Sequence, residues 1–296
     1  MPFSLHSHSG QFCEHAKGTL EEVVQEAIKK NFIVYGLSEH CPRYREQDLY
    51  PEEFHLKPSD LINTFTAYVH EARRLQQKYK SQITLIVGLE SETINSSSSS
   101  EALCIKSEHD LDYIIGSVHH VHETPIDFDE EQFANALKKS SNDDEKLFEA
   151  YFDAQYKTLK EVKPLIVGHF DVIRIYRPNW QITQAVWEKI KRNVDCVIDY
   201  GGLFEINAAA WTVGLPDAYP QRDILQLIVS KGGRCTISDD SHGPLSVGRN
   251  YDKLYGYLTE MEIYTLYYLD YGDDGKSMVI KELKDALEHK FWDQWI

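Results

Sequence analysis

The stretch Ile83-Thr84-Leu85-Ile86-Val87-Gly88-Leu89-Glu90 has the pattern on which most of this chain is built. A nearly continuous apolar run of this length is typical of a strand that is buried on both faces, as in a parallel sheet. Glu90 follows the run directly, and a carboxylate is costly to bury there unless it is paired or binds a metal ion. The stretch therefore predicts a buried strand with a functional side chain at its carboxyl end.

Short apolar runs that end in histidine or a carboxylate recur along the chain. His40, His119 and His169 each follow such a run. Segments with the apolar spacing of amphipathic helices lie between the runs. We expect a first strand that starts near residue 2, further strands at 32–38, 83–89, 113–118, 165–167, 203–206 and 235–238, and helices at 19–31, 59–79, 144–161, 184–193 and 222–231.

Strands that alternate with helices predict right-handed βαβ units and a parallel sheet. A (β/α) barrel fits the number of units best, and barrels carry their chemistry at the carboxyl ends of the strands. A doubly wound open sheet is the alternative, but it does not easily bring six strand ends to one point. We expect a single domain over residues 1–296, with a low-complexity loop at 95–101 and a C-terminal helix at about 278–296.

Composition excludes several classes of partner. The formal net charge of −16 disfavours nucleic acid, because binding to its backbone requires a basic surface. No run approaches the length of a membrane-spanning helix, and the first residues lack the features of a secretory signal. The five cysteines are odd in number and lack Cys-x-x-Cys spacing, which indicates reduced thiols in a cytoplasmic protein. Cys13 and Cys41 stand near candidate histidines, but buried, inert thiols are the expectation.

The two ends of the chain carry related motifs. His6 and His8 are two positions apart, so in a strand their imidazoles point to the same face and can hold one cation. Asp240-Ser241-His242 repeats this spacing after a buried strand near the other end. Because the first and last strands of a closed barrel are neighbours, we expect these two motifs to meet.

These residues resemble the polymerase-and-histidinol-phosphatase (PHP) superfamily of metal-dependent phosphoesterases. The resemblance spans residues 6–242 and rests on His6-Ser7-His8, His15, Ser38-Glu39-His40, Gly88-Leu89-Glu90, Gly116-Ser117-Val118-His119-His120, Gly168-His169-Phe170-Asp171 and Asp240-Ser241-His242. It implies a distorted (β/α)7 barrel of the TIM-like type with a trinuclear metal site.

The resemblance also implies a ligand set for three divalent ions. His6, His8, Glu90 and Asp240 would hold the first ion; Glu90, His119 and His169 the second; His15, His40 and His242 the third. Nitrogen and oxygen donors suit Zn²⁺, Mn²⁺ or Fe²⁺. Water bound to such ions loses a proton near neutral pH, so a bridging hydroxide is the expected nucleophile toward phosphorus. Asp240 and His120 are the catalytic candidates, with His120 as the candidate general acid.

Within the superfamily the chain most resembles the monofunctional histidinol-phosphate phosphatases of histidine biosynthesis. That resemblance implies L-histidinol phosphate as substrate. The alternatives are another phosphorylated metabolite or a phosphotyrosyl peptide and, from a different class, a binding module without catalysis. For the substrate phosphate we consider Arg174, Arg177 and Arg249, since guanidinium groups match phosphate, against simple surface solvation. Asn207 also ends a strand and is expected to line the pocket.

Overall fold

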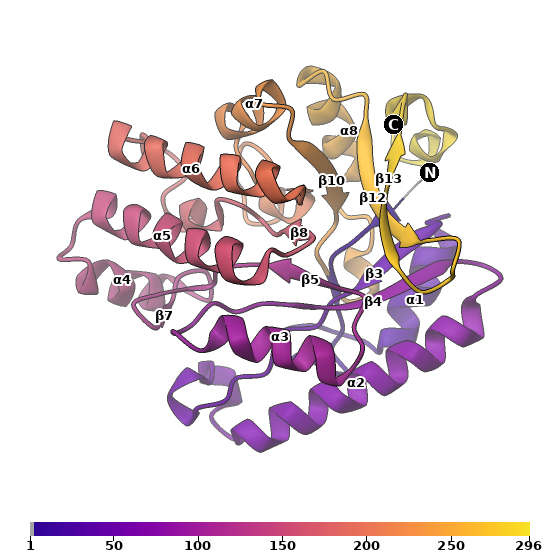
Figure 1. Ribbon diagram of the computed structural model, residues 1–296, viewed down its shortest axis with the longest axis horizontal. Helices are drawn as coiled ribbons and strands as arrows, with labels where there is room; N and C mark the ends of the chain where they lie inside the picture. Colours follow the sequence, from indigo (N-terminus) through magenta and orange to yellow (C-terminus); the bar gives the residue numbers. More distant parts are fainter. Residues whose placement is uncertain (1–2) are drawn as a thin grey trace.

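Seven parallel strands form the centre of the computed structural model, which describes residues 3–296 (Figure 1). Their spatial order is β1, β3, β4, β5, β8, β9 and β10. Their bounds are β1 Phe3–Ser4, β3 Val34–Leu37, β4 Thr84–Glu90, β5 Tyr113–Gly116, β8 Ile166–Val167, β9 Leu203–Asn207 and β10 Arg234–Ser238. Nearly every residue of these strands is buried, as expected for a parallel sheet covered on both faces. The predicted (β/α)7 barrel is confirmed.

Helices surround the strands and give the barrel its outer layer. They are α1 Leu20–Lys29, α2 Pro58–Tyr79, α3 Ser98–Glu108, α4 Glu130–Lys139, α5 Asp144–Val162, α6 Gln184–Tyr200, α7 Arg222–Ser230 and α8 Tyr251–Glu260. Local sequence fixes several ends: Thr19 and Glu22 form a capping box at the start of α1, and Gly201 ends α6 in the left-handed region with φ of 81°. Within residues 3–296, none of the helices has the length and apolarity to cross a bilayer.

The barrel closes where the first strand meets the last. The Ser4 hydroxyl donates to Asp239 Oδ1 at 2.8 Å, and the backbone N–H of Asp239 donates back to Ser4 Oγ at 3.1 Å. Beyond this contact, β2 (Ser7–His8) pairs in parallel with β11 (Ser241–His242). The meeting of the two terminal motifs that the sequence predicts is therefore present, at the carboxyl ends of the strands.

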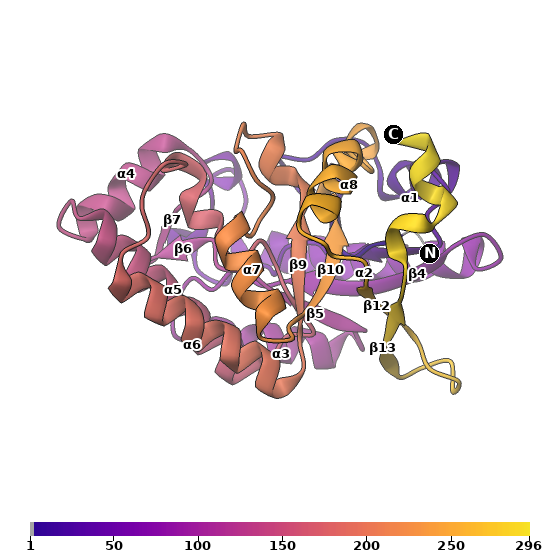
Figure 2. The same ribbon diagram turned by 90° about the horizontal axis from the view of Figure 1, so that it is seen from above.

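Two predicted segments are corrected. The serine-rich stretch at 95–101 is not a loop throughout, because Ser98 begins α3 and its Oγ accepts the backbone N–H groups of Ile94 and Asn95. The predicted helix at 278–296 is instead a strand, β13 Met278–Leu283, antiparallel to β12 Leu266–Tyr271, followed by two 3-10 turns, Ala286–Glu288 and Lys290–Gln294. Figure 2 shows this hairpin beside the turns that lead to the C-terminus.

Short elements on the connections complete the fold. A small hairpin, β6 (His120–Val121) with β7 (Thr124–Pro125), follows β5. Further 3-10 turns are η1 Glu46–Asp48, η2 Pro51–Glu53, η3 Val172–Tyr176, η4 Ala208–Trp211 and η5 Pro244–Ser246. Several of these turns border the cavity described next.

Candidate metal centre

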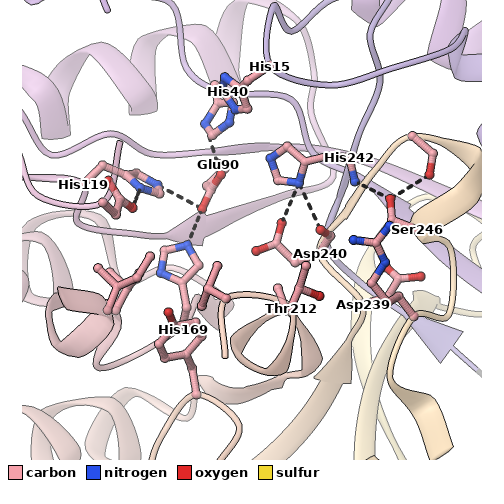
Figure 3. Close-up of a pocket in the computed structure, with 18 of the residues that line it drawn as sticks. His15, His40, Glu90, His119, His169, Thr212, Asp239, Asp240, His242 and Ser246 are labelled. Carbon is pink, nitrogen blue, oxygen red and sulfur yellow. Dashed lines mark hydrogen bonds and ion pairs between the residues drawn. The ribbon is translucent and has the colours of Figure 1, made fainter. Parts of the chain in front are cut away.

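A cavity of about 660 Å³ opens at the carboxyl ends of the strands (Figure 3). Imidazole and carboxylate groups cover its floor, and they come from strands on all sides of the barrel. The predicted metal ligands that line it are His15, His40, Glu90, His119, His169, Asp240 and His242. His6 and His8 lie just beneath, completely buried. The structure thus brings all nine predicted donors to one place.

Glu90, at the end of β4, lies at the middle of the cluster and is 1% exposed. Its Oε1 lies 3.1 Å from Nε2 of His119 and 2.8 Å from Nε2 of His169. Its Oε2 lies 3.1 Å from Nδ1 of His40 (Figure 3). Because its two oxygens face different histidines, Glu90 has the geometry expected of a carboxylate that bridges two cations.

His6, His8 and Asp240 form a second side of the cluster. The Nε2 atoms of both histidines lie 3.6 Å from Asp240 Oδ1, and His6 Nε2 is 3.2 Å from Glu90 Oε2. Asp240 has a φ of 46°, in the left-handed region that aspartate tolerates better than most residues. This backbone turns its carboxylate toward the two imidazoles.

His15, His40 and His242 form the third side, closer to solvent. The ring of His15 lies with its centroid 5.3 Å from that of His40 and 5.2 Å from that of His242. Its side chain is 35% exposed, so this side borders the cavity entrance. Cys13 Sγ lies 3.2 Å from His15 Nε2, which places a buried sulfur next to the donors.

Acidic side chains lie close to Nδ1 of most of these histidines, and the sequence analysis did not predict this role for them. The carboxylates and their distances are Glu205 to His6 Nδ1 (2.8 Å), Glu39 to His8 Nδ1 (3.4 Å), Glu52 to His15 Nδ1 (2.7 Å), Glu92 to His40 Nδ1 (3.0 Å) and Asp127 to His119 Nδ1 (2.7 Å). Such partners fix the tautomer and orientation of metal-binding imidazoles and raise their basicity. A sequence signal existed for Glu205, which is an acidic residue inside an otherwise apolar strand.

The cluster fits divalent cations on its own geometry. His6 Nε2, His8 Nε2, His40 Nε2 and Asp240 Oδ1 are buried and make no hydrogen bond. Donor atoms of His6, His8 and Asp240 lie within 4.8 Å of one another, as do those of His6, Glu90 and His169, and of His8, His40 and His242. Buried polar atoms without partners are costly, and a shared cation would satisfy them.

The titration of these groups reflects the same crowding. Burial alone would raise the pKa of Glu90, but His6, His119 and His40 together hold it well below its usual range. Burial would lower the pKa of His8, but its bonds to Glu39 and Glu90 raise that pKa to about 9. The carboxylates of Glu90 and Asp240 are therefore ionised at neutral pH, and the imidazole of His8 beside them is stabilised in its protonated form.

Two of the arginines considered for phosphate binding lie elsewhere. Arg174 is buried, with its guanidinium paired to Asp171 at 2.9 Å and donating to the carbonyl of Ala218. Arg177 pairs with Asp144 at 2.9 Å. Neither lines the cavity, so both predictions are corrected: these arginines hold the connection after β8 in place.

The three remaining candidates, Arg249, Asn207 and His120, lie in different surroundings. Arg249 lines the cavity. Asn207 does not: its amide donates to Glu205 and to Asp240 Oδ2, both at 3.0 Å, so it orients carboxylates. His120 is 2% exposed and absent from the cavity lining, and burial lowers its pKa to about 4. A neutral, buried imidazole is a poor proton donor at neutral pH, which argues against His120 as the general acid.

A (β/α) barrel whose strand ends gather imidazole and carboxylate donors around one cavity belongs to the class of metal-dependent hydrolase barrels. Residues 4–209 match the family model "PHP domain", and the chain belongs to this family.

Its relatives agree with that assignment. The chain is 46% identical to a Schizosaccharomyces pombe protein named "Probable histidinol-phosphatase", over 96% of this chain and 94% of the relative. It is 30% identical to the Saccharomyces cerevisiae "Histidinol-phosphatase", over 98% of each.

Solved structures share the fold. One from Listeria monocytogenes has a TM-score of 0.73 at 21% identity and covers 85% of this chain and 99% of its own. A histidinol phosphate phosphatase from Lactococcus lactis, in complex with zinc, L-histidinol and phosphate, has a TM-score of 0.67 at 19% identity, covering 94% of this chain and 98% of its own.

Proposed function

We propose that this chain is a metal-dependent phosphomonoesterase that hydrolyses L-histidinol phosphate to L-histidinol and phosphate, a step of histidine biosynthesis. The convergence of nine imidazole and carboxylate donors on one cavity carries the proposal of metal-dependent hydrolysis. The names of the relatives at 46% and 30% identity over nearly the whole chain support the substrate.

We further propose that three divalent ions occupy the cluster, with zinc, manganese or iron as the candidates. His6, His8, Glu90 and Asp240 would hold the first, Glu90, His119 and His169 the second, and His15, His40 and His242 the third. When bound, such ions lower the pKa of water and neutralise charge on a phosphoryl group. Glu90 and Asp240, held in their ionised forms, are ready to accept cations without first losing a proton.

The walls of the cavity fit the two ends of the substrate. Arg249 and Lys17 are exposed cations at the cavity, beside the loop that follows His242, and they can attract a phosphate dianion. Tyr50, Phe128 and Val213 add apolar and aromatic surface to the lining, which suits a carbon chain that ends in an imidazole ring. Arg249 is the arginine that we assign to substrate binding.

Phosphate release from L-histidinol phosphate tests the proposal directly. The protein is stripped with a chelator, reloaded with Zn²⁺, Mn²⁺ or Fe²⁺, and assayed beside a panel of phosphorylated metabolites and a phosphotyrosyl peptide. We expect activity only with metal, and the highest kcat/KM with L-histidinol phosphate. A higher kcat/KM with another member of the panel would assign that compound as the substrate instead. If no member releases phosphate, the proposed phosphatase activity is rejected.

We also propose a cytoplasmic location. All five cysteines are free thiols, and a reducing compartment maintains that state. Fractionation of the producing cells, with the protein detected by antibody, tests this proposal.

A further inference from the structure

A single turn contacts the surroundings of two metal-binding histidines at once. The turn comprises Tyr50–Glu53 and contains η2. The carboxylate of Glu52 binds His15 Nδ1 at 2.7 Å. The carboxylate of Glu53 pairs with Arg43, and Arg43 Nη1 in turn donates to Glu92 Oε1 at 3.0 Å.

Glu92 brings this chain of contacts to the second histidine. The same oxygen, Oε1, lies 3.0 Å from Nδ1 of His40. The Tyr50 hydroxyl donates to the other oxygen, Oε2, also at 3.0 Å. Two residues of the turn therefore hold Glu92, one directly and one through Arg43. Arg43, Glu53 and Glu92 are all buried, with exposed fractions of 6%, 4% and 4%.

The turn is rigid in its own right. The backbone N–H of Tyr50 donates to Glu53 Oε2 at 3.0 Å, and the N–H of Glu53 donates to the Tyr50 carbonyl at 2.8 Å. Pro51 between them restricts the backbone further. Glu52 and Glu53 are thus presented in fixed directions, one toward His15 and the other toward Arg43.

We propose that the 50–53 turn is a positioning element for the ion held by His15, His40 and His242, and that it sets the affinity of that ion without touching it. The proposal rests on the metal-dependent function given above. His15 and His40 belong to two different segments of chain. Glu52 of the turn bonds to Nδ1 of His15, and Glu92, which the turn holds, lies 3.0 Å from Nδ1 of His40. Such carboxylate partners typically change metal affinity by about 10–100-fold when they are removed.

The same turn also reaches the substrate side of the cavity. The Tyr50 ring lines the cavity and stacks on Phe128 with a centroid distance of 5.3 Å, while its hydroxyl holds Glu92. The turn therefore lies between the cavity wall and the carboxylates that contact His15 and His40.

Zinc binding at equilibrium tests the proposal. Wild type, Glu52→Ala and Glu52→Gln are dialysed against buffers of defined free Zn²⁺, and bound zinc per chain is measured by elemental analysis. Glu14→Gln is the matched control. Glu14 is an exposed carboxylate next to His15, and its substitution removes the same charge as the Glu52 variants do. Glu52 is the better test position, since its side chain is 26% exposed and its loss leaves no buried cation unpaired.

We expect Glu52→Ala to weaken one ion per chain by about 10–100-fold, with the remaining zinc unchanged, and Glu52→Gln to weaken it less, because the amide oxygen still accepts a hydrogen bond. Glu14→Gln should bind zinc as wild type does. Equal zinc binding in wild type and both Glu52 variants would overturn the proposal, as would an equal loss of every ion together with a lower melting temperature, which indicates a purely structural role. Failure of wild type to release phosphate would count against the proposed function alone, since the zinc measurement does not depend on it.

Discussion

His8 and His242 are register partners in a two-residue parallel ladder, and their ring centroids lie 4.5 Å apart. The ladder joins β2 to β11, which come from opposite ends of the chain. Because paired residues in a parallel ladder point their side chains the same way, this register alone places both imidazoles on the cavity side. The backbone of the closing seam thus positions part of the candidate metal centre.

Asp240, next to that ladder, should be essential for activity but not for folding. Asp240→Asn keeps the shape of the side chain while it removes the charge that His6 and His8 face. We expect phosphate release to fall by roughly 100-fold or more, since loss of even an indirect partner of a metal site costs about 10–100-fold. Circular dichroism should be unchanged. The control is Asp252→Asn, which changes an exposed carboxylate on α8. Full activity in Asp240→Asn would contradict the ligand set.

Metal binding should release protons at neutral pH. In chelator-stripped protein the pKa of His8 is about 9, above its usual value, so this imidazole is protonated at any pH well below 9. A metal ion binds only the neutral ring, so uptake of zinc at about pH 7.5 must displace that proton, and zinc affinity must rise as the pH approaches 9. Titration calorimetry in two buffers of different ionisation enthalpy measures the protons released. Identical apparent enthalpies in both buffers would refute the prediction.

Arg174 should matter for stability. The residue is 3% exposed, and its guanidinium pairs with the buried Asp171 and stacks on Tyr219 with Cζ 4.9 Å from the ring centroid. Arg174→Leu leaves the Asp171 carboxylate buried without its cation, which typically costs about 3–5 kcal/mol. Urea unfolding should show that loss, and Arg174→Leu combined with Asp171→Leu should recover part of it. Wild-type stability in the single variant would show that the pair contributes little.

Arg249 should matter for substrate binding. It is exposed at the cavity, so Arg249→Gln should leave the melting temperature unchanged. Loss of one charge-assisted hydrogen bond to a phosphate, about 1.5 kcal/mol, corresponds to a rise in KM of about 10-fold. Steady-state kinetics with L-histidinol phosphate measure it. Lys253→Gln, which removes an exposed cation of α8, is the control and should keep the wild-type KM.

The barrel strands were predictable because burial on both faces leaves a clear apolar signature. The expected strand at 83–89 and the observed β4 Thr84–Glu90 differ by one residue at each end. The segment that was predicted wrongly at the C-terminus depends on contacts with residues distant in the sequence. The C-terminal aromatics pack against α8 instead of forming a helix of their own: Trp292 packs on Tyr251, and its indole N–H donates to the Ala286 carbonyl. No sequence pattern within residues 278–296 predicts those contacts.

The residues of the candidate site also differ in whether the sequence could predict them. Donors that directly follow apolar runs, such as Glu90 and His119, could be recognised from their position. Most of the carboxylates behind the histidines could not: Glu52 and Asp127, for example, lie on connections whose course only the folded chain determines. The function of Arg174 was misjudged for the same reason, since its sequence position after β8 does not reveal that it turns toward Asp171.

The seam between β1 and β10 has a consequence for the unfolded chain. Ser4 and Asp239 are 235 positions apart, so an ion held by both His8 and Asp240 would cross-link two distant parts of the polypeptide. A cross-link that closes a loop of this length reduces the entropy of the unfolded ensemble by an amount worth about 5 kcal/mol. Metal supply would then control resistance to unfolding in the way that oxidation controls it in a disulfide-bonded protein, but reversibly and in a reducing compartment.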